Sequence, residues 1–553
     1  MNGSMSPSDP DRLSRRTFLG LLAGTGVALT ATLGGGVNFL RGKWKRRTVL
    51  GGEGIQGTVL GANHKWGHRI RSGNLPVPSE VVPVEVLIAG GGIAGLSAGW
   101  KLLNSGFGEF RILELESSAG GNSRWGENAV SRYPWGAHYL PMPTRESRAV
   151  RELLQEMKVF ESGPHGELRA DSRHLCHAPH ERLFVHGNWQ GGIFPNASWG
   201  PEESRQVRRF EEHLKIWRTW KDVSGRSAFA LPRIYSSSDP AVRKLDEISM
   251  ATYLERHGLD SPRVRWYVDY ACRDDYGCSI ETTSAWAGLH YFCARGVSDP
   301  DVFTWPEGNG RIVQHLLDRI GDRVETGSLV YRIEPDKEGV TVDSIRVETG
   351  EVVRYRAENV VYSMPIFTAP YIVKGWDRSG LESFSYAPWM VANLTVDRVP
   401  EGAVWDNVLH RSPGLGYVVA THQNLQVHTG PSVLTYYRPF AEMDPGEARN
   451  RLLETSWSVW RDEILEDLSS AHPDLAGRVS RIDVMLHGHA MIRPTPGFMW
   501  GKVREEVGLP FQGIRFAHSD LSGFSLFEEA QYHGVRVAEE ILESRGHDYE
   551  SSL

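Results

Sequence analysis

A glycine-rich turn between an apolar run and a helical segment is the feature that most constrains how this chain folds. Residues 84–89 read VEVLIA, an almost wholly apolar run typical of a strand buried in a parallel sheet. Residues 90–95 read GGGIAG, residues 96–105 have the pattern of a helix ending at Gly106, and residues 110–115 read as a second strand. This order predicts a β-α-β unit that opens an α/β fold of the Rossmann type.

The glycines of the turn match the pattern GxGxxG, and each meets a steric requirement of dinucleotide binding. Gly90 permits the tight turn, Gly92 lets the backbone approach a pyrophosphate, and Gly95 lets the helix pack closely on the strand. The start of the helix, at Ile93 and Ala94, presents unpaired N–H groups and the positive end of the helix dipole to phosphates. These five residues are therefore predicted to bind a dinucleotide cofactor.

Further motifs distinguish one dinucleotide from another. Glu114 ends the second predicted strand, where an acidic residue hydrogen-bonds ribose hydroxyls. The chain then carries GGNSR at 120–124, PEGNG at 306–310 and FAHSD at 516–520, followed by EEA at 528–530. These motifs resemble those of the flavin-containing amine oxidase, phytoene desaturase and protoporphyrinogen oxidase superfamily. The resemblance implies that the cofactor is FAD and that the protein is an FAD-dependent oxidoreductase.

The resemblance also assigns cofactor contacts beyond the glycine turn. In the family, the second glycine pair and a nearby arginine cross the FAD phosphates, and a later strand lies on the adenine side. An acidic residue after the last strand faces the ribityl-phosphate region, and the following helix points its N-terminus at the flavin. The contacts added in this way are Gly120, Gly121, Arg124, Val330, Asp520 and Ala530. For Asp520, capping of a helix is the alternative interpretation.

The implied fold is α/β, with a Rossmann-like FAD-binding domain interleaved with an α+β substrate domain. The FAD-binding domain is expected to comprise residues 83–145, 300–370 and 480–545, and the substrate domain residues 146–299 and 371–479. The substrate pocket is expected between the two domains, where such pockets usually form.

The catalytic residues are harder to predict, because the flavin itself carries the redox chemistry. The amine-oxidase branch has a lysine near the flavin in a substrate-domain strand, whereas the matching stretch 387–394, APWMVANL, has none. We interpret His489 as a base near the flavin or as a histidine hydrogen-bonded within a loop. Arg493 is a candidate partner for a substrate carboxylate or a surface ion-pair residue. The charged run at 273–275 is expected on a helix surface. Further pocket candidates are Trp389, Tyr417, Tyr436 and Tyr437, and at least two of them are expected to be core aromatics instead.

Composition argues against several other classes of protein. The formal net charge is −7 and there is no long run of like charge, which argues against a nucleic-acid partner. His64 and His68 have no third ligand in the sequence, so no metal site is predicted. Four cysteines lack zinc-binding or thioredoxin spacing and are expected as buried thiols: Cys176, Cys272, Cys278 and Cys293.

Residues 1–47 have the pattern of a targeting segment. The sequence SRRTFL at 14–19 precedes a weakly apolar stretch that ends at Leu40, which resembles a bacterial twin-arginine signal. This implies export of the folded protein to the periplasm by the twin-arginine machinery. A basic cluster at 41–47 follows without a clear cleavage site, so the leader is either removed or retained as a membrane anchor. Residues 48–82 are predicted to be an extended connector.

Two classes of function fit the sequence. The first is an enzyme that oxidises a CH–NH or CH–CH bond of a small molecule and passes the electrons to oxygen or a quinone. The missing lysine lowers the expectation of simple amine oxidation. The second is a non-catalytic FAD-binding protein of the cell envelope, and an NAD-binding reductase is a third alternative.

Overall fold

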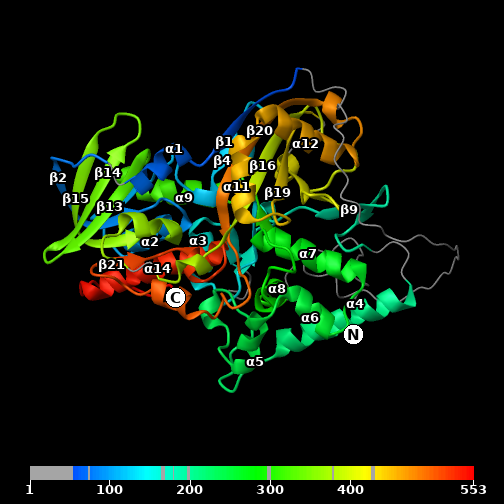
Figure 1. Ribbon diagram of the computed structural model, residues 1–553, viewed down its shortest axis with the longest axis horizontal. Coiled ribbons are helices and arrows are strands. Elements are labelled where there is room, and N and C mark those ends of the chain that lie inside the picture. The colour runs from blue at the N-terminus through cyan, green and yellow to red at the C-terminus, as the bar shows by residue number, and fades with distance from the viewer. Residues whose placement is uncertain are drawn as a thin grey trace.

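The structure is a computed structural model. It describes residues 54–72, 75–162, 168–178, 180–195, 200–295, 301–376, 379–424 and 430–553, so the predicted leader at 1–47 lies outside the described residues. Two large sheets lie next to each other along the long axis of the molecule, with a layer of helices at one end (Figure 1). Within the described ranges, no helix is long and apolar enough to cross a membrane.

The first sheet carries the predicted β-α-β unit. Its strand order is β12-β3-β2-β15-β14-β13, with β21 also paired to β15. The pairs at the centre are parallel, whereas β13, β14 and β15 form an antiparallel extension. The strands are β2 (Val81–Ala89), β3 (Phe110–Leu113), β12 (Val324–Glu325), β13 (Ser328–Asp336), β14 (Gly339–Arg346), β15 (Val352–Tyr362) and β21 (Ile514–Phe516).

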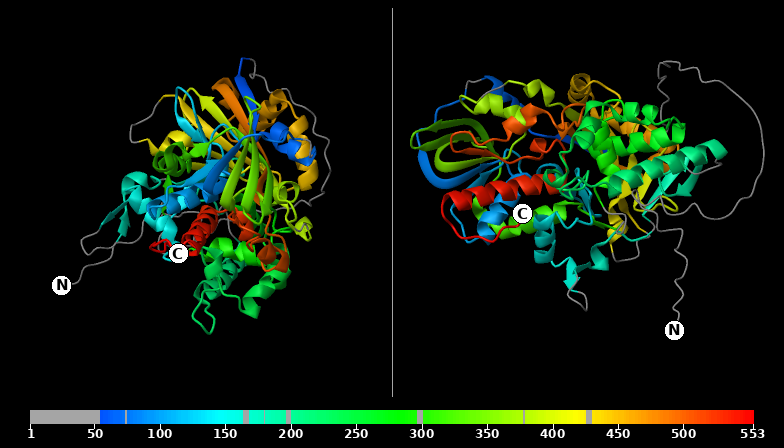
Figure 2. Two further views of the ribbon diagram at one scale, coloured as in Figure 1. Left: turned by 90° about the vertical axis from the view of Figure 1, so that its left-hand side faces the viewer. Right: turned by 90° about the horizontal axis from the view of Figure 1, so that it is seen from below.

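Three helices pack on the parallel part of this sheet: α2 (Ile93–Asn104), α9 (Gly310–Ile320) and α14 (Phe527–Ser544). The C-terminal helix α14, red in Figure 2, lies along α2. A Cβ atom at Gly534 of α14 would lie 2.1 Å from the carbonyl oxygen of Ala94, so glycine is what allows this close approach. The last helix of the chain therefore lies against the first turn of α2, directly after the glycine-rich turn.

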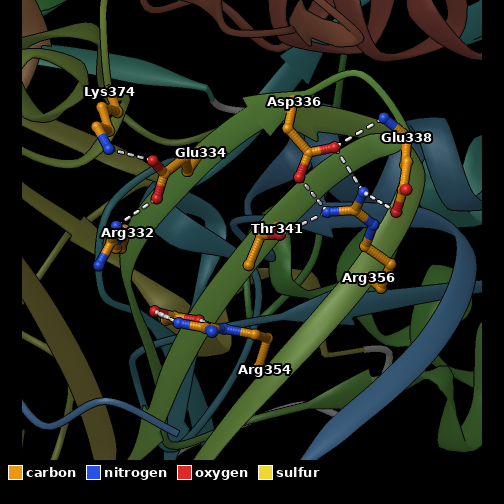
Figure 3. Close-up of polar contacts among 9 residues, drawn as sticks. Arg332, Glu334, Asp336, Glu338, Thr341, Arg354, Arg356 and Lys374 are labelled. Carbon is orange, nitrogen blue, oxygen red and sulfur yellow. Dashed lines mark hydrogen bonds and ion pairs between the residues drawn. The ribbon is translucent and has the colours of Figure 1, made fainter.

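Charge pairs join the strands of the antiparallel extension (Figure 3). Arg354 of β15 lies opposite Asp343 of β14 and donates two hydrogen bonds to its carboxylate, at 2.7 and 2.9 Å. Arg356 pairs with Asp336, and this contact lowers the pKa of the Asp336 carboxyl to about 2. The arginines on this surface are thus compensated by carboxylates of their own sheet.

The second sheet has eight strands in the order β1-β20-β16-β19-β18-β17-β9-β10. It is mainly antiparallel, and its central strands β16 and β20 are long. The strands are β1 (Gln56–Gly61), β9 (Glu181–Val185), β10 (Asn188–Gly191), β16 (Tyr386–Val396), β17 (Asp406–Leu409), β18 (Gly416–Val419), β19 (Ser432–Pro439) and β20 (Val479–Ile492).

Helices cover this second half of the molecule. Two of them, α11 (Pro445–Glu454) and α12 (Trp457–Ser469), pack on one face of the eight-stranded sheet. Four more, green in Figure 1, form a separate layer around the fully buried Trp286: α4 (Pro201–Thr219), α6 (Met250–Arg256), α7 (Pro262–Tyr276) and α8 (Ala285–Cys293). All four cysteines are buried free thiols, as predicted.

The folded part of the chain begins earlier than the sequence indicated. Residues 48–82 were expected to be an extended connector, but residues 56–72 form β1 and two short helices, α1 (His64–Gly67) and η2 (His68–Ser72). Strand β1 pairs in parallel with β20, and a Cβ atom at Gly57 would lie only 1.8 Å from the Ile482 carbonyl oxygen. The short GTVLG run was not predicted as a strand, because its partner is β20, which is more than 400 residues later in the sequence.

One expected domain boundary also differs from the structure. The third FAD-binding segment was expected to begin at residue 480, but β20 runs from Val479 to Ile492 inside the eight-stranded sheet. The chain returns to the first sheet only afterwards, reaching it at β21. The strand was misassigned because hydrophobic alternation identifies a strand without identifying its sheet.

Candidate active site

One cavity of about 1920 Å³ lies between the two sheets and is lined from both sides. It reaches from the glycine turn of the first sheet to β16, β18, β19 and β20 of the second. Eleven of the twelve predicted cofactor residues line it: Gly90, Gly92, Ile93, Ala94, Glu114, Gly120, Gly121, Arg124, Val330, Asp520 and Ala530. The fold therefore brings together motifs that are more than 400 residues apart in the sequence.

The glycine turn has the geometry that its pattern predicts. Gly90 has a φ of +110°, and a Cβ there would lie 2.7 Å from the Ser363 carbonyl oxygen. A Cβ at Gly95 would lie 2.0 Å from the Gly90 carbonyl oxygen, so Gly95 serves helix packing and is absent from the cavity wall. A Cβ at Gly92 would meet no atom within 4 Å. Gly92 therefore faces open space, and what it must accommodate is a ligand.

Glu114 is held in place by the backbone of its neighbours. Its carboxylate accepts hydrogen bonds from the N–H groups of Gly91, at 2.7 Å, and Glu116, at 2.9 Å. Burial raises the pKa of Glu114, although these N–H groups and the charge of Arg124 act in the opposite direction. Arg124 in turn lies 3.3 Å from a carboxylate oxygen of Glu116. The Glu114 carboxylate is thus fixed at the cavity wall by backbone N–H groups of the glycine turn and of its own loop.

Asp520 connects the two halves of the molecule. It lies in the short helix η12 (Ser519–Leu521), is buried, and accepts hydrogen bonds from the Tyr386 hydroxyl at 2.6 Å and the Ile366 N–H at 3.1 Å. Burial alone would raise the pKa of Asp520, but His518 and these two donors outweigh it and lower that pKa. Helix α14 begins after Leu526 without a side-chain cap. Asp520 is therefore not the cap of that helix.

The residues around this part of the cavity fit FAD. Gly92 leaves room for a phosphate next to the uncapped start of α2, and Glu114 presents a fixed carboxylate nearby. The uncapped start of α14, at residues 525–528, lines the same cavity. Two helix N-termini therefore face the cavity, and they suit a ligand that carries negative charge.

Comparison with known proteins gives the family. The sequence matches the family described as flavin containing amine oxidoreductase over residues 93–542, which is most of the chain. The chain belongs to this family. The family consists of FAD-dependent oxidoreductases, and FAD is its cofactor. The cofactor and the enzyme class expected from the sequence are thereby confirmed.

Relatives in the flavin amine oxidoreductase family are distant. Human flavin-containing amine oxidase B is 24% identical over 336 residues, which is 58% of this chain and 56% of the human protein. The bovine enzyme is 22% identical over 354 residues, or 59% of this chain and 57% of the relative. The chain thus matches somewhat more than half the length of these curated relatives.

Solved structures of low sequence identity share the fold. Putrescine oxidase bound to putrescine has a TM-score of 0.62 at 16% identity, covering 84% of this chain and all of that one. Cyclohexylamine oxidase from Brevibacterium oxydans has a TM-score of 0.60 at 17% identity, covering 84% and 99%. A CLA-producing fatty acid isomerase from P. acnes has a TM-score of 0.58 at 15% identity, covering 83% and 98%. The predicted α/β fold is confirmed.

The two predicted catalytic candidates lie in different places. His489 of β20 lines the cavity, and its ring stacks on Phe367 at a centroid distance of 4.3 Å. Burial, followed by nearby cations, lowers the pKa of His489 to about 4, so the ring is neutral at pH 7 and a weak base. Arg493 does not line the cavity. Just past the end of β20, its guanidinium donates to Cys278 Sγ at 3.3 Å and to Ser385 Oγ at 3.1 Å, so its expected role as partner of a substrate carboxylate in this cavity is wrong.

The aromatic candidates are divided by strand alternation. Trp389, Tyr417 and Tyr437 are at the cavity wall and Tyr436 is not, but Tyr417 lies directly opposite Tyr436 on the neighbouring strand, and its hydroxyl is 2.9 Å from His472 Nε2. Trp389 and Tyr437 are therefore on the cavity face of the sheet, and the side chains of Tyr417 and Tyr436 are on the other. Neighbouring residues of a strand point to opposite faces, and the Tyr436 hydroxyl donates to Asp467 of α12 at 2.7 Å on the other side of the sheet. Tyr436 is therefore a core aromatic, as expected for at least two of the four candidates, because its side chain packs between the sheet and α12.

Several cavity residues were missed by the sequence reasoning. The charged run at 273–275 was expected on a helix surface, but Asp274 and Asp275 at the end of α7 line the cavity and Asp275 is buried. Tyr386, which bonds Asp520, was also missed. The one available signal was a run of three charges at the end of α7, and it does not say which face of the helix is buried.

Proposed function

We propose that this protein oxidises a CH–NH or CH–CH bond of a small molecule by hydride transfer to FAD. The observation that carries the proposal is the single cavity that joins the dinucleotide crevice to the aromatic face of the eight-stranded sheet. A donor molecule bound against Trp389 and Tyr437 shares one enclosed space with a cofactor held at Gly92 and Glu114. A site in which FAD served structure alone would not need such a chamber.

The residues that would hold FAD are the glycine turn with the start of α2, Glu114, and the start of α14. FAD, when bound, accepts a hydride from the substrate carbon and passes the electrons to an acceptor. The protein supplies shape and electrostatics. The turn and helix ends bind the negative charge of the cofactor, Asp520 and Tyr386 fix the junction of the two halves, and the aromatic residues exclude water from the reacting bond.

Whether the substrate bond is CH–NH or CH–CH depends on a lysine that this chain lacks. Strand β16 has no lysine, and among the residues described at the cavity wall Lys65 is the only one. Several relatives are named as oxidases of amines, whereas one structural neighbour is named as a fatty acid isomerase. We keep both CH–NH and CH–CH bonds in the proposal. The lysine that lies near the flavin in the amine-oxidase branch is missing from β16, so this chain differs from that branch close to the reacting atoms.

We further propose that the protein acts outside the cytoplasm. Arg15 and Arg16 before a weakly apolar stretch support export by the twin-arginine machinery, which carries folded proteins and so allows FAD to be taken up first. The acceptor would then be oxygen or a membrane quinone. Changing both arginines to lysine should leave the flavin-loaded protein in the cytoplasm, and unchanged delivery to the periplasm would argue against this route.

The test of the proposed reaction is anaerobic bleaching of the flavin. The full-length protein is mixed with a panel of amines and of saturated donors that can lose two hydrogens, and absorbance of the oxidised flavin is followed. We expect at least one donor to bleach it, and oxygen or a soluble quinone to restore the colour. A flavin that no donor reduces, but that dithionite does reduce, would indicate a non-catalytic FAD-binding protein.

A further inference from the structure

The N-terminal strap, which we define as residues 56–72, joins both halves of the molecule at the cavity. Its strand β1 pairs with β20 of the second sheet. Its helical part packs on the first sheet, where Trp66 and Ile70 contact a small cluster that includes Leu115. The Asn63 N–H also donates to Glu116 at 2.7 Å. The strap lies outside residues 93–542, over which the chain matches the family.

The strap and α11 bring positive charge to the cavity wall. Lys65, His68 and Arg71 of the strap and Arg449 of α11 all line the cavity. Arg449 lies over the strand at Gly488, where an added Cβ would be 3.7 Å from its Cγ atom. Arg71 lies over the ring of Tyr371 in α10 (Ala369–Ile372), at 5.8 Å. Burial and the charge of Arg71 lower the pKa of His68, so the cations here are Lys65, Arg71 and Arg449. These three approach one stretch of the wall from the strap and from α11, and we call them the mouth cations.

His489 shows that two of these cations, Arg449 and Arg71, act on one place. Burial is the main reason for its lowered pKa, and the charges of Arg449, Arg71 and His68 add to it. Asp520 acts in the opposite direction, but its carboxylate is already engaged by His518, Tyr386 and the Ile366 N–H.

The mouth cations lack the carboxylate partners that other arginines of this protein have. Within the part of the chain that the structure describes, none of the three forms an ion pair with an acidic side chain. Asp444 acts on Arg449 from a distance, but its Oδ1 accepts the N–H groups of Gly446 and Glu447 at the start of α11. In contrast, Arg354 and Arg356 are paired within their own sheet (Figure 3). Uncompensated cations at a cavity are suited to an anionic ligand.

The rim of the same wall is apolar. Val59 and Leu60 of β1 are 39% and 40% exposed, Tyr371 of α10 is 46% exposed, and Leu453 of α11 is 57% exposed. All four line the cavity, and Leu453 lies one helical turn after Arg449, on the same face of α11. Large apolar side chains that gather at one exposed place commonly mark a binding surface. Cations and exposed apolar side chains therefore line the same cavity.

We propose that this mouth binds an amphiphilic anion, so that the substrate carries a carboxylate or similar group on an apolar body. The inference deepens the proposed function and rests on it. The mouth cations would attract and orient the charged group, while the rim and the aromatic chamber would take up the apolar part. An alkylammonium ion of the same length would meet the same cations and be repelled. The substrate would then differ in charge from putrescine, the ligand of a structural neighbour.

The experiment compares three ligands of one chain length on the full-length, FAD-loaded protein. Octanoate, octylammonium and octanol are titrated by calorimetry and by the difference spectrum of the flavin. We expect octanoate to bind at least about tenfold more tightly than octylammonium, which is the effect of one charge-assisted contact. Changing Arg71 and Arg449 together to glutamine should weaken octanoate binding at least about tenfold and leave octanol unchanged.

Arg69 provides the matched control. It lies in the same short helix as Arg71 but stacks on Trp66 at 4.1 Å and does not line the cavity. Arg69→Gln should bind octanoate as the unaltered protein does. Equal losses in Arg69→Gln and in the double variant would overturn the proposal, because the effect would then come from general surface charge.

Other outcomes would also overturn the inference. Loss of FAD in the double variant would assign the mouth cations to the cofactor. Binding to phosphatidylglycerol vesicles that requires Arg71 and Arg449, without saturable octanoate binding, would make the mouth a membrane-facing surface. Tighter binding of octylammonium would point to a cationic substrate. Calorimetric binding needs no turnover, so a flavin that no donor reduces would contradict the proposed function without affecting this result.

Discussion

The two sides of the cavity are built in different ways. The cofactor side is made largely of backbone: a glycine turn, two helix N-termini, and a carboxylate held by N–H groups at Glu114. The substrate side is made of side chains from several elements, among them Trp389, Tyr437, Asp275 and the mouth cations. The difference teaches that a ligand bound by backbone leaves a short motif in the sequence, whereas a chamber lined by side chains does not.

The largest effect is expected at Gly92, on the cofactor side. A valine there has open space within the protein and an ordinary φ of −74°, so Gly92→Val should fold normally. Its side chain would occupy the space of the cofactor and should weaken FAD binding at least about 100-fold. Gly90→Val is the contrast, since its Cβ would collide with the Ser363 carbonyl and the protein itself should lose stability. Flavin content and melting temperature of both variants check this, and a yellow Gly92→Val would show that the cofactor is bound elsewhere.

Glu529 is a buried acid behind the cofactor side, and its ionisation gives a second test of how the two sides of the cavity differ. Burial raises the pKa of Glu529 to about 7, while the Ser522 hydroxyl and the Arg233 N–H donate to its carboxylate. Because the folded pKa lies above the unfolded one, Glu529 favours the folded state below about pH 4.5 and loses this contribution as the pH rises through 7. Glu529→Gln should therefore gain stability relative to the unaltered protein between pH 5 and pH 8, by roughly 2–3 kcal/mol at most.

That gain is measured as a difference in free energy of unfolding at the two pH values. The comparison of two proteins cancels titrating groups that are remote from Glu529. The buried His533 is not remote, because the Ser522 hydroxyl bonds both side chains, so His533→Gln is measured alongside. A difference that stays constant from pH 5 to pH 8 would show that Glu529 is ionised throughout.

Asp520 lies where the two sides meet, and its loss should affect both. Asp520→Asn keeps the shape but removes a buried charge, so FAD affinity should fall about tenfold and the flavin midpoint potential should change. Tyr386→Phe removes one donor to the same carboxylate and should have a smaller effect of the same kind. Unchanged affinity and potential in Asp520→Asn, with only a lower melting temperature, would assign Asp520 to the structure alone.

The smallest effect is expected from His489 on the substrate side. Its pKa of about 4 keeps the ring neutral from pH 5.5 to pH 8. The rate of flavin reduction in His489→Gln should therefore depend on pH over this range as it does in the unaltered protein. A step near pH 6.5 that disappears in the variant would restore His489 as an acid or base in the reaction.

Much of the cofactor side could be predicted from the sequence. The GxGxxG pattern identifies Gly90, Gly92 and Gly95, because a residue with a side chain would not fit the tight turn, the bound cofactor or the helix packing. Asp520 was found only through resemblance, since its partners Tyr386 and Ile366 lie more than 130 residues away. The fold became predictable once the β-α-β unit was recognised.

The substrate side was mostly beyond prediction. Tyr436 and Tyr437 look alike in sequence, and only the register of β19 decides which one reaches the cavity. The N-terminal strap was read as a connector because β1 has no partner until β20 is folded. Arg71 and Arg449 are 378 positions apart, and no local pattern links them.

The flavin content of the purified full-length protein is the most direct test of the central claim, that the crevice at Gly92 and Glu114 holds FAD beside a substrate chamber. The protein is denatured, and the released cofactor is identified and counted against the chain. We predict one FAD per chain and a visible spectrum that changes when octanoate is added. A colourless protein that takes up no FAD on incubation, or one that releases NAD instead, would contradict the account.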